Sequence, residues 1–154
     1  MPGELITTET ALVPTTLPAD QNPALVYLAR LGSDKSRAAM RYGLRAVAEV
    51  LTDGRLSATT LPWAALRYQH TAAIRTALAE RYAPATVNNY LSALRGVLKE
   101  AWRLGQLDAE SYQRAIDLEP VRGETLPAGR EIAPTELQEL FRIIEMDDGP
   151  LGAR

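Results

Sequence analysis

The sequence lacks residue types on which much protein chemistry depends. Its 154 residues include no cysteine and a single histidine, His70. The absence of cysteine excludes disulfides, thiol catalysis and cysteine-bound metals. One histidine is too few for a metal site built from imidazoles, and no glycine-rich phosphate-binding loop or Ser-His-Asp pattern is present. We therefore expect neither a metal nor a cofactor.

Long apolar runs and a recognisable leader are also missing. No stretch approaches the roughly 20 apolar residues that cross a bilayer, and residues 1–20 lack a basic region followed by an apolar one. The composition is otherwise ordinary for a globular protein, with 46% hydrophobic and 23% charged residues. We expect a cytoplasmic protein that has no membrane partner.

Positively charged side chains are missing from the N-terminal part of the sequence. Residues 1–29 hold no lysine or arginine and three acids, residues 30–103 hold twelve basic residues against five acids, and residues 104–154 hold five against eleven. The net charge of −2 therefore conceals a basic middle of +7 between flanks of −3 and −6. This pattern indicates either a module that binds a polyanion or an ordinary solvated basic surface.

Apolar periodicity and helix-start signals predict an all-α fold, a bundle of four or five helices followed by one separate helix. The predicted helices cover residues 23–31, 33 or 36 to 52, 62–82, 84–104 and 109–118, and a last amphipathic helix opens at Pro134. The predicted organisation is a flexible arm over residues 1–21, a helical domain over 22–118, an interdomain linker over 119–133 and a further fragment over 134–154.

Two polar helix faces are candidates for nucleic-acid binding. In the 84–104 helix, one face carries Asn88, Ser92, Arg95, Lys99 and Arg103, with Asn89 at its edge. In the preceding long helix, Arg37, Arg41 and Arg45 recur every four residues beside Lys35 and Ser36. Amides and guanidinium groups can contact base edges and phosphates when a helix enters the major groove. The alternative for both faces is ordinary solvation.

Several other residues have ordinary explanations. Gly43 and Gly96 lie inside predicted helices, where glycine costs about 1 kcal/mol relative to alanine. Either a helix or a DNA backbone approaches closely there, or the positions are merely tolerant. His70 is expected to be a surface or partly packed histidine, and Trp63 and Trp102 are expected in the core.

A series of segments resembles one known family. The segments are APATVNNYLSALR at 83–95, KEAW at 99–102, Leu104-Gly105, SDKS at 33–36, the Leu61-Pro62-Trp63 step, Leu126-Pro127 and PTELQEL at 134–140. In this order they resemble the core-binding domain of tyrosine recombinases (phage integrases), its linker and the first helix of the catalytic domain.

The resemblance implies a SAM-like helical domain that forms half of a clamp around double-stranded DNA at a recombination site. The second and fourth helices of such domains approach the major groove, and the full-length proteins assemble as tetramers on DNA. The residues to which this role carries over are Lys35, Ser36, Arg37, Arg41, Arg45, Thr86, Asn88, Asn89, Ser92, Arg95 and Lys99.

The chain departs from the family where the chemistry would lie. His70 is followed three residues later by Ala73 rather than by the arginine of the family's His-x-x-Arg motif, and no tyrosine has a catalytic-domain context. We therefore expect no enzymatic activity and no small-molecule substrate for this chain, which looks like the N-terminal part of a longer integrase. The alternatives are a helical protein-interaction bundle and an enzyme that relies on Asp/Glu chemistry.

Overall fold

The computed structural model describes residues 12–123, and these form a helical bundle with no β-strand among them. The elements are η1 (Ala19–Gln21), α2 (Pro23–Arg30), α3 (Asp34–Thr52), η2 (Trp63–Ala65), α4 (Tyr68–Arg81), α5 (Pro84–Arg103) and α6 (Ala109–Ala115). The prediction of an all-α bundle is confirmed. The helix predicted at Pro134 lies outside the described residues.

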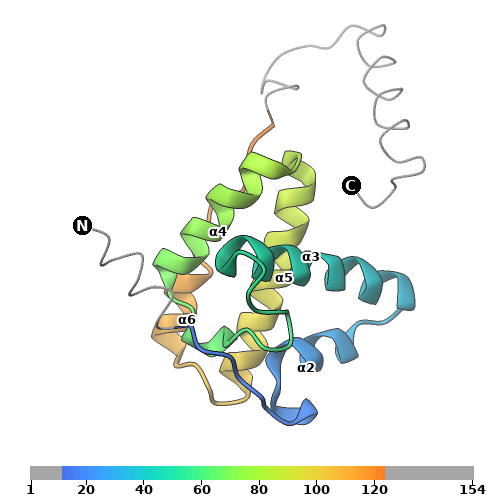
Figure 1. Cartoon of the computed structure of the whole chain (residues 1–154), viewed down its shortest axis with the longest axis vertical. Helices are drawn as coiled ribbons and strands as arrows, with labels where there is room; N and C mark the ends of the chain where they lie inside the picture. The colour runs from blue at the N-terminus through green and yellow to red at the C-terminus, as the bar shows by residue number, and fades with distance from the viewer. Residues whose placement is uncertain (1–11, 124–154) are drawn as a thin grey trace, which may run out of the picture.

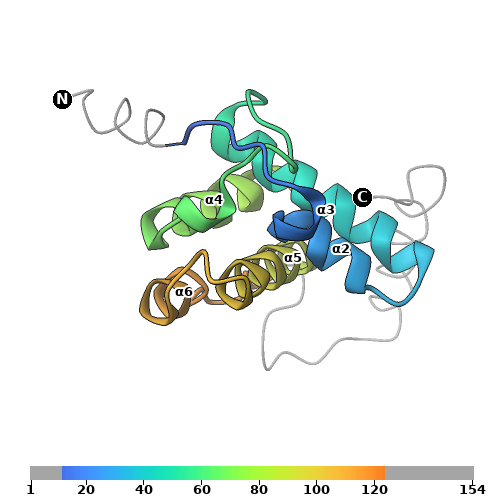
Figure 2. The ribbon, with the colours of Figure 1, turned by 90° about the horizontal axis from the view of Figure 1, so that it is seen from below.

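Helix α5 is the central element of the bundle (Figure 1). It contacts α2, α3, α4 and α6 as well as η2. Turning the molecule shows α6 beside α5, with α4 above both and in contact with each of them (Figure 2). The predicted apolar stripe explains this position, because Val87, Leu91, Leu94 and Leu98 are fully buried.

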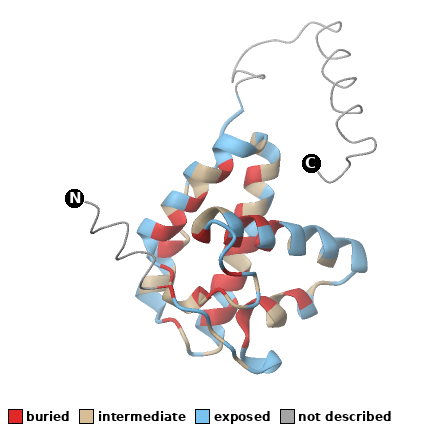
Figure 3. Ribbon diagram, viewed as in Figure 1, coloured by how far each residue is buried: buried red, intermediate tan, exposed pale blue. Residues whose placement is uncertain are grey.

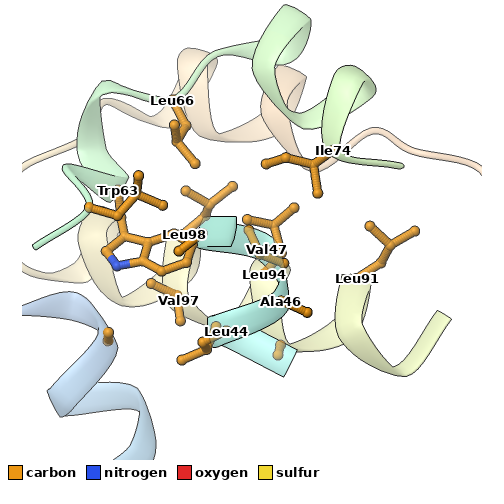
Figure 4. Close-up of a cluster of buried hydrophobic side chains, with 14 of the residues drawn as sticks. Leu44, Ala46, Val47, Trp63, Leu66, Ile74, Leu91, Leu94, Val97 and Leu98 are labelled. Atoms are coloured by element: carbon orange, nitrogen blue, oxygen red, sulfur yellow. The ribbon is translucent and has the colours of Figure 1, made fainter. Parts of the chain in front are cut away.

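Buried residues recur along the helices (Figure 3), and their side chains form one core (Figure 4). Leu44 and Val47 of α3 face Leu94 of α5, and Ile74 of α4 closes the other side (Figure 4). Trp63 is buried as predicted, and its indole N–H donates to the Ala58 carbonyl at 2.8 Å. The core therefore unites helices that are distant in sequence.

The placement of Trp102 corrects the prediction that it is a core residue. Its side chain is 41% exposed, and its ring stacks on that of Tyr112 with centroids 5.7 Å apart. Residue 102 lies at the edge of the α5 stripe, where the short α6 offers one aromatic ring but no further cover.

Side-chain caps set three of the helix starts. Asn22 accepts from the Ala24 N–H at 3.1 Å, Ser33 from the Ser36 N–H at 3.1 Å, and Asp108 from the Ser111 N–H at 3.0 Å. These bonds satisfy N–H groups that the first turn of a helix leaves unpaired. Hydrogen bonding to Ser111 also lowers the pKa of Asp108.

The predicted helix over residues 62–82 is interrupted. Residues Trp63–Ala65 form a single 3₁₀ turn, Leu66 is extended and buried, and α4 begins only at Tyr68. At the start of α4 one half of a capping box is present, in which the His70 ring nitrogen Nδ1 accepts the Arg67 N–H at 2.9 Å. Burying both Trp63 and Leu66 requires the turn, which apolar periodicity does not reveal.

The two helical glycines mark helix crossings. A Cβ atom on Gly43 would lie 2.9 Å from Tyr90 Cδ1, and one on Gly96 would lie 2.3 Å from Tyr27 Cε1. Of the alternatives drawn from the sequence, close approach of a helix is therefore the correct one. Gly43 sets the spacing of α3 on α5, and Gly96 that of α2 on α5.

The predicted arm over residues 1–21 is wrong from residue 12 onward. Leu12 is 1% exposed, and the Thr15 N–H donates to the Thr60 carbonyl at 2.9 Å. The Asn22 side chain donates to the Thr59 carbonyl at 2.9 Å. Leu12 lies in the short apolar run Ala11-Leu12-Val13 within a stretch rich in threonine and proline. A run of this length shows no periodicity, so its packing could not be predicted from the sequence.

Candidate nucleic-acid interface

The arginine row on α3 divides into one structural residue and two exposed ones. Arg37 donates to the Leu28 carbonyl at 3.0 Å and to the Leu31 carbonyl at 2.8 Å, and it pairs with Asp34 at 2.7 Å. It thereby satisfies carbonyl groups at the C-terminal end of α2. This network occupies the guanidinium, so we leave Arg37 out of the candidate interface.

Arg41 and Arg45 project from an exposed part of α3. Neither forms an ion pair with any residue in 12–123. Both line a groove of about 450 Å³ whose opposite wall is formed by residues 57–59. The Arg45 guanidinium lies 5.7 Å from the ring centroid of Tyr42, which is 51% exposed. Lys35 and Ser36 are exposed in the first turn of the same helix.

Two residues predicted to contact DNA from α5 instead bind the backbone of this chain. The Asn88 amide donates to the Val121 carbonyl at 3.0 Å and accepts from the Val121 N–H at 2.8 Å. Arg95 donates to the carbonyls of Ile116 and Leu118 at 3.3 and 2.8 Å. These groups replace the partners that a helix or strand would offer the backbone.

The segment over residues 116–121 is attached to the bundle mainly by side chains. Besides Asn88 and Arg95, Arg75 of α4 donates to the carbonyls of Glu119 and Pro120 at 2.7 and 3.1 Å. Two predictions are corrected as a result. The fifth helix ends at Ala115 rather than near residue 118, and the linker expected from residue 119 begins as a segment bound to α4 and α5.

The remaining α5 candidates have separate surroundings. Asn89, Ser92 and Lys99 are exposed, and none of their side chains hydrogen-bonds to another described residue, whereas Thr86 is half-buried. Arg103, on the same side of α5, lies 3.1 Å from Glu100. The groove on α3 contains no α5 residue, so the two sets of candidates occupy distinct surfaces.

Helix α5 also carries a buried carboxylate that was not predicted from the sequence. Glu100 is 3% exposed and accepts hydrogen bonds from Arg30 of α2 at 2.6 Å and from Arg103 at 3.1 Å. A buried carboxylate requires such partners to offset its desolvation. The available signal was its position four residues after Gly96, on the face that packs against α2.

His70 has a structural role. It is buried, and its Nδ1 atom is the acceptor in the α4 capping box. Burial lowers the pKa of His70, and the nearby Arg67 guanidinium lowers it further. A neutral imidazole is the form that can accept the Arg67 N–H.

Comparisons with protein-family models, with curated proteins and with solved structures find no match to this chain. Within residues 12–123, no helix has the length and apolar character that crossing a membrane requires.

Proposed function

We propose that this chain is the DNA-binding core-binding domain of a site-specific tyrosine recombinase, unable to cut or join DNA by itself. The observation that carries the proposal is the exposed pair Arg41 and Arg45 on α3, neither of which forms an ion pair with a carboxylate in residues 12–123. The order of the helices agrees with the resemblance drawn from the sequence. The cap of α3 at Ser33 and the start of α5 at Pro84 agree with it as well.

Binding is driven mainly by phosphate contacts from α3. Arg41 and Arg45 supply two guanidinium groups, and Lys35 adds a positive charge six residues before Arg41. On α5, Asn89 and Ser92 are available to read base edges, and Lys99 to contact a phosphate. Asn88, Arg95 and Arg37 are excluded from the proposed interface because their polar atoms bind the chain itself.

The test is fluorescence anisotropy of a labelled random-sequence duplex, titrated with the full chain across a salt series. The variant R41Q/R45Q should weaken binding and reduce the steepness of log K against log salt by up to about 2, because each lost phosphate contact removes about 0.9.

A matched control removes two positive charges elsewhere. Arg81 is exposed at the end of α4, and Arg114 forms an exposed ion pair with Glu110. The R81Q/R114Q variant should retain the wild-type salt slope. Equal losses in both double variants would indicate a general charge effect and would refute an interface on α3.

The remaining proposals concern the full-length recombinase. It works in the cytoplasm and assembles as a tetramer on paired recombination sites, with no membrane or small-molecule partner. Sedimentation of the full-length protein on a duplex carrying the site should give a four-subunit complex, whereas a persistent one-subunit complex would contradict this assembly.

A protein-interaction bundle is the alternative function. Exposed aromatic side chains favour it, because Tyr68 is 51% and Trp102 is 41% exposed. Aromatic residues are enriched at protein interfaces. The duplex titration distinguishes the two functions, since an interaction bundle predicts no salt-dependent binding of DNA.

A further inference from the structure

A second concavity adjoins the groove on α3. It has a volume of about 410 Å³ and includes Arg45 and Ser57, which also line the first groove. Because two residues are common to both, the concavities form one depression between α3 and the loop that follows it. We call this depression the α3–loop groove, and the arginine, serine and threonine residues that line it are Arg41, Arg45, Arg55, Ser57, Thr59 and Thr60.

The loop wall of this groove is held in place by specific contacts at its start. Asp53 has a left-handed backbone with φ of 58°, which ends α3. The Thr52 hydroxyl then accepts the Leu56 N–H at 3.0 Å, and the Leu56 side chain is buried. These contacts fix the backbone on both sides of Arg55, whose side chain is exposed.

The end of the loop is equally well anchored. The Ser57 N–H donates to the Thr60 hydroxyl at 2.8 Å, and the Leu61 N–H donates to the Ser57 carbonyl at 2.9 Å. The side chain of Asn22, the residue before α2, donates to the Thr59 carbonyl. The Ser57 hydroxyl lies 3.1 Å from that of Thr59 and 3.0 Å from that of Thr60, so the three hydroxyls form one hydrogen-bonded cluster. A hydroxyl can both donate and accept, so each retains capacity for a further partner, and the ordered turn lowers the entropy cost of binding a ligand.

The chemistry of the lining is that of a site for phosphate and sugar. Arginine, serine, threonine and tyrosine are residue types that contact nucleic-acid backbones. Three guanidinium groups face this groove, and Arg55, like Arg41 and Arg45, has no ion-pair partner among residues 12–123. One carboxylate, Glu49, also lines it and opposes an anionic ligand.

We propose that the α3–loop groove binds the phosphodiester backbone of the duplex, with Arg55, Ser57 and Thr59 supplying contacts in addition to those of Arg41 and Arg45. This inference rests on the proposed DNA-binding function and adds the loop as its second wall. The loop was not predicted as a binding element, because Arg55 belongs to no helical row.

The test uses two variants of the full chain that should act in opposite directions in the duplex titration. R55Q should weaken binding by roughly threefold or more, the share of one phosphate contact. E49Q should tighten binding, because it removes the one negative charge that lines the groove. A gain of affinity cannot result from damage to the fold, so this variant guards against misfolding.

The matched controls are R81Q and E80Q, which change exposed side chains of α4. If the duplex binds but R55Q and E49Q behave as these controls do, the groove is not a phosphodiester site, while the proposed function stands. If no duplex binds even at low salt, both proposals fail.

A further experiment with inorganic phosphate distinguishes a site for a nucleic-acid backbone from a site for a free phosphate ligand. Inorganic phosphate is added in place of chloride at equal ionic strength, and thermal unfolding is recorded. Stabilisation by phosphate that R55Q abolishes, in the absence of duplex binding, would assign the groove to a small phosphate and overturn the proposal. Duplex binding that responds to R55Q and E49Q supports it.

Discussion

Asn88 and Asn89 are adjacent on α5, but replacing each by alanine should affect a different property, stability for Asn88 and duplex affinity for Asn89. The Asn88 amide makes two hydrogen bonds to the backbone of Val121, at 3.0 and 2.8 Å. Asn89 is exposed, and its side chain hydrogen-bonds to no other described residue. The two residues thus separate a role in the fold from a role in binding.

The magnitude follows from the contacts that are lost. Each hydrogen bond contributes about 1 kcal/mol net, so Asn88→Ala removes about 2 kcal/mol. Alanine returns roughly 0.6 kcal/mol of helix propensity. The free energy of unfolding should fall by about 1.5 kcal/mol, which lowers Tm by roughly 5 °C in a domain of this size. Asn89→Ala should leave Tm unchanged or slightly raised.

The assays are thermal unfolding followed by circular dichroism and the duplex titration, performed well below both Tm values. Asn88→Ala should lower Tm while leaving duplex affinity intact, and Asn89→Ala should reduce affinity while leaving Tm intact. An Asn88→Ala variant with normal Tm and weakened duplex binding would refute the structural role assigned here. It would restore the sequence-based prediction that Asn88 contacts DNA.

Two further predictions concern packing and pH. Gly96→Ala should destabilise the fold by about 1 kcal/mol, because overpacking against the Tyr27 ring outweighs the gain in helix propensity. In a Tyr27→Ala background the same change should stabilise the fold. Urea titrations of the four proteins measure both changes in the free energy of unfolding, and two changes of the same sign would contradict the prediction. Since the pKa of His70 is lowered in the fold, the unfolded chain binds more protons below its pKa of about 6.5. The free energy of unfolding should therefore fall as the pH drops from about 7 towards 5.5. His70→Gln, which keeps an acceptor for the Arg67 N–H, should reduce this pH dependence. An equal slope in the variant would contradict the role assigned to His70.

Local signals predicted most of the helices. Asn22, Ser33 and Asp108 were recognisable caps, and each makes the expected bond within three residues. The apolar stripe of α5 identified its buried face, because the helical repeat alone determines which residues share a side. Where two elements share one apolar run, as at η2 and α4, periodicity failed to show the break between them.

The candidate site was less predictable, because a polar face does not reveal which of its members bind the chain itself. The partner of Asn88 lies 33 residues away in sequence, and those of Arg95 lie 21 and 23 residues away. Nothing local distinguishes these residues from the exposed Asn89 and Lys99. The loop residue Arg55 is the converse case, since only folding brings it beside Arg45.

The helical class, the caps, the buried stripe of α5 and the basic character of the middle of the chain could all be predicted from the order of the residues. These properties depend on neighbours within about two helical turns, which the order of residues specifies directly. Which polar side chains remain available to a ligand became known from the folded structure. The reason is that backbone groups in distant segments, such as residues 116–121, need hydrogen-bond partners. Arg75, Asn88 and Arg95 bind that segment. The side chains of Arg41, Arg45 and Arg55 remain exposed.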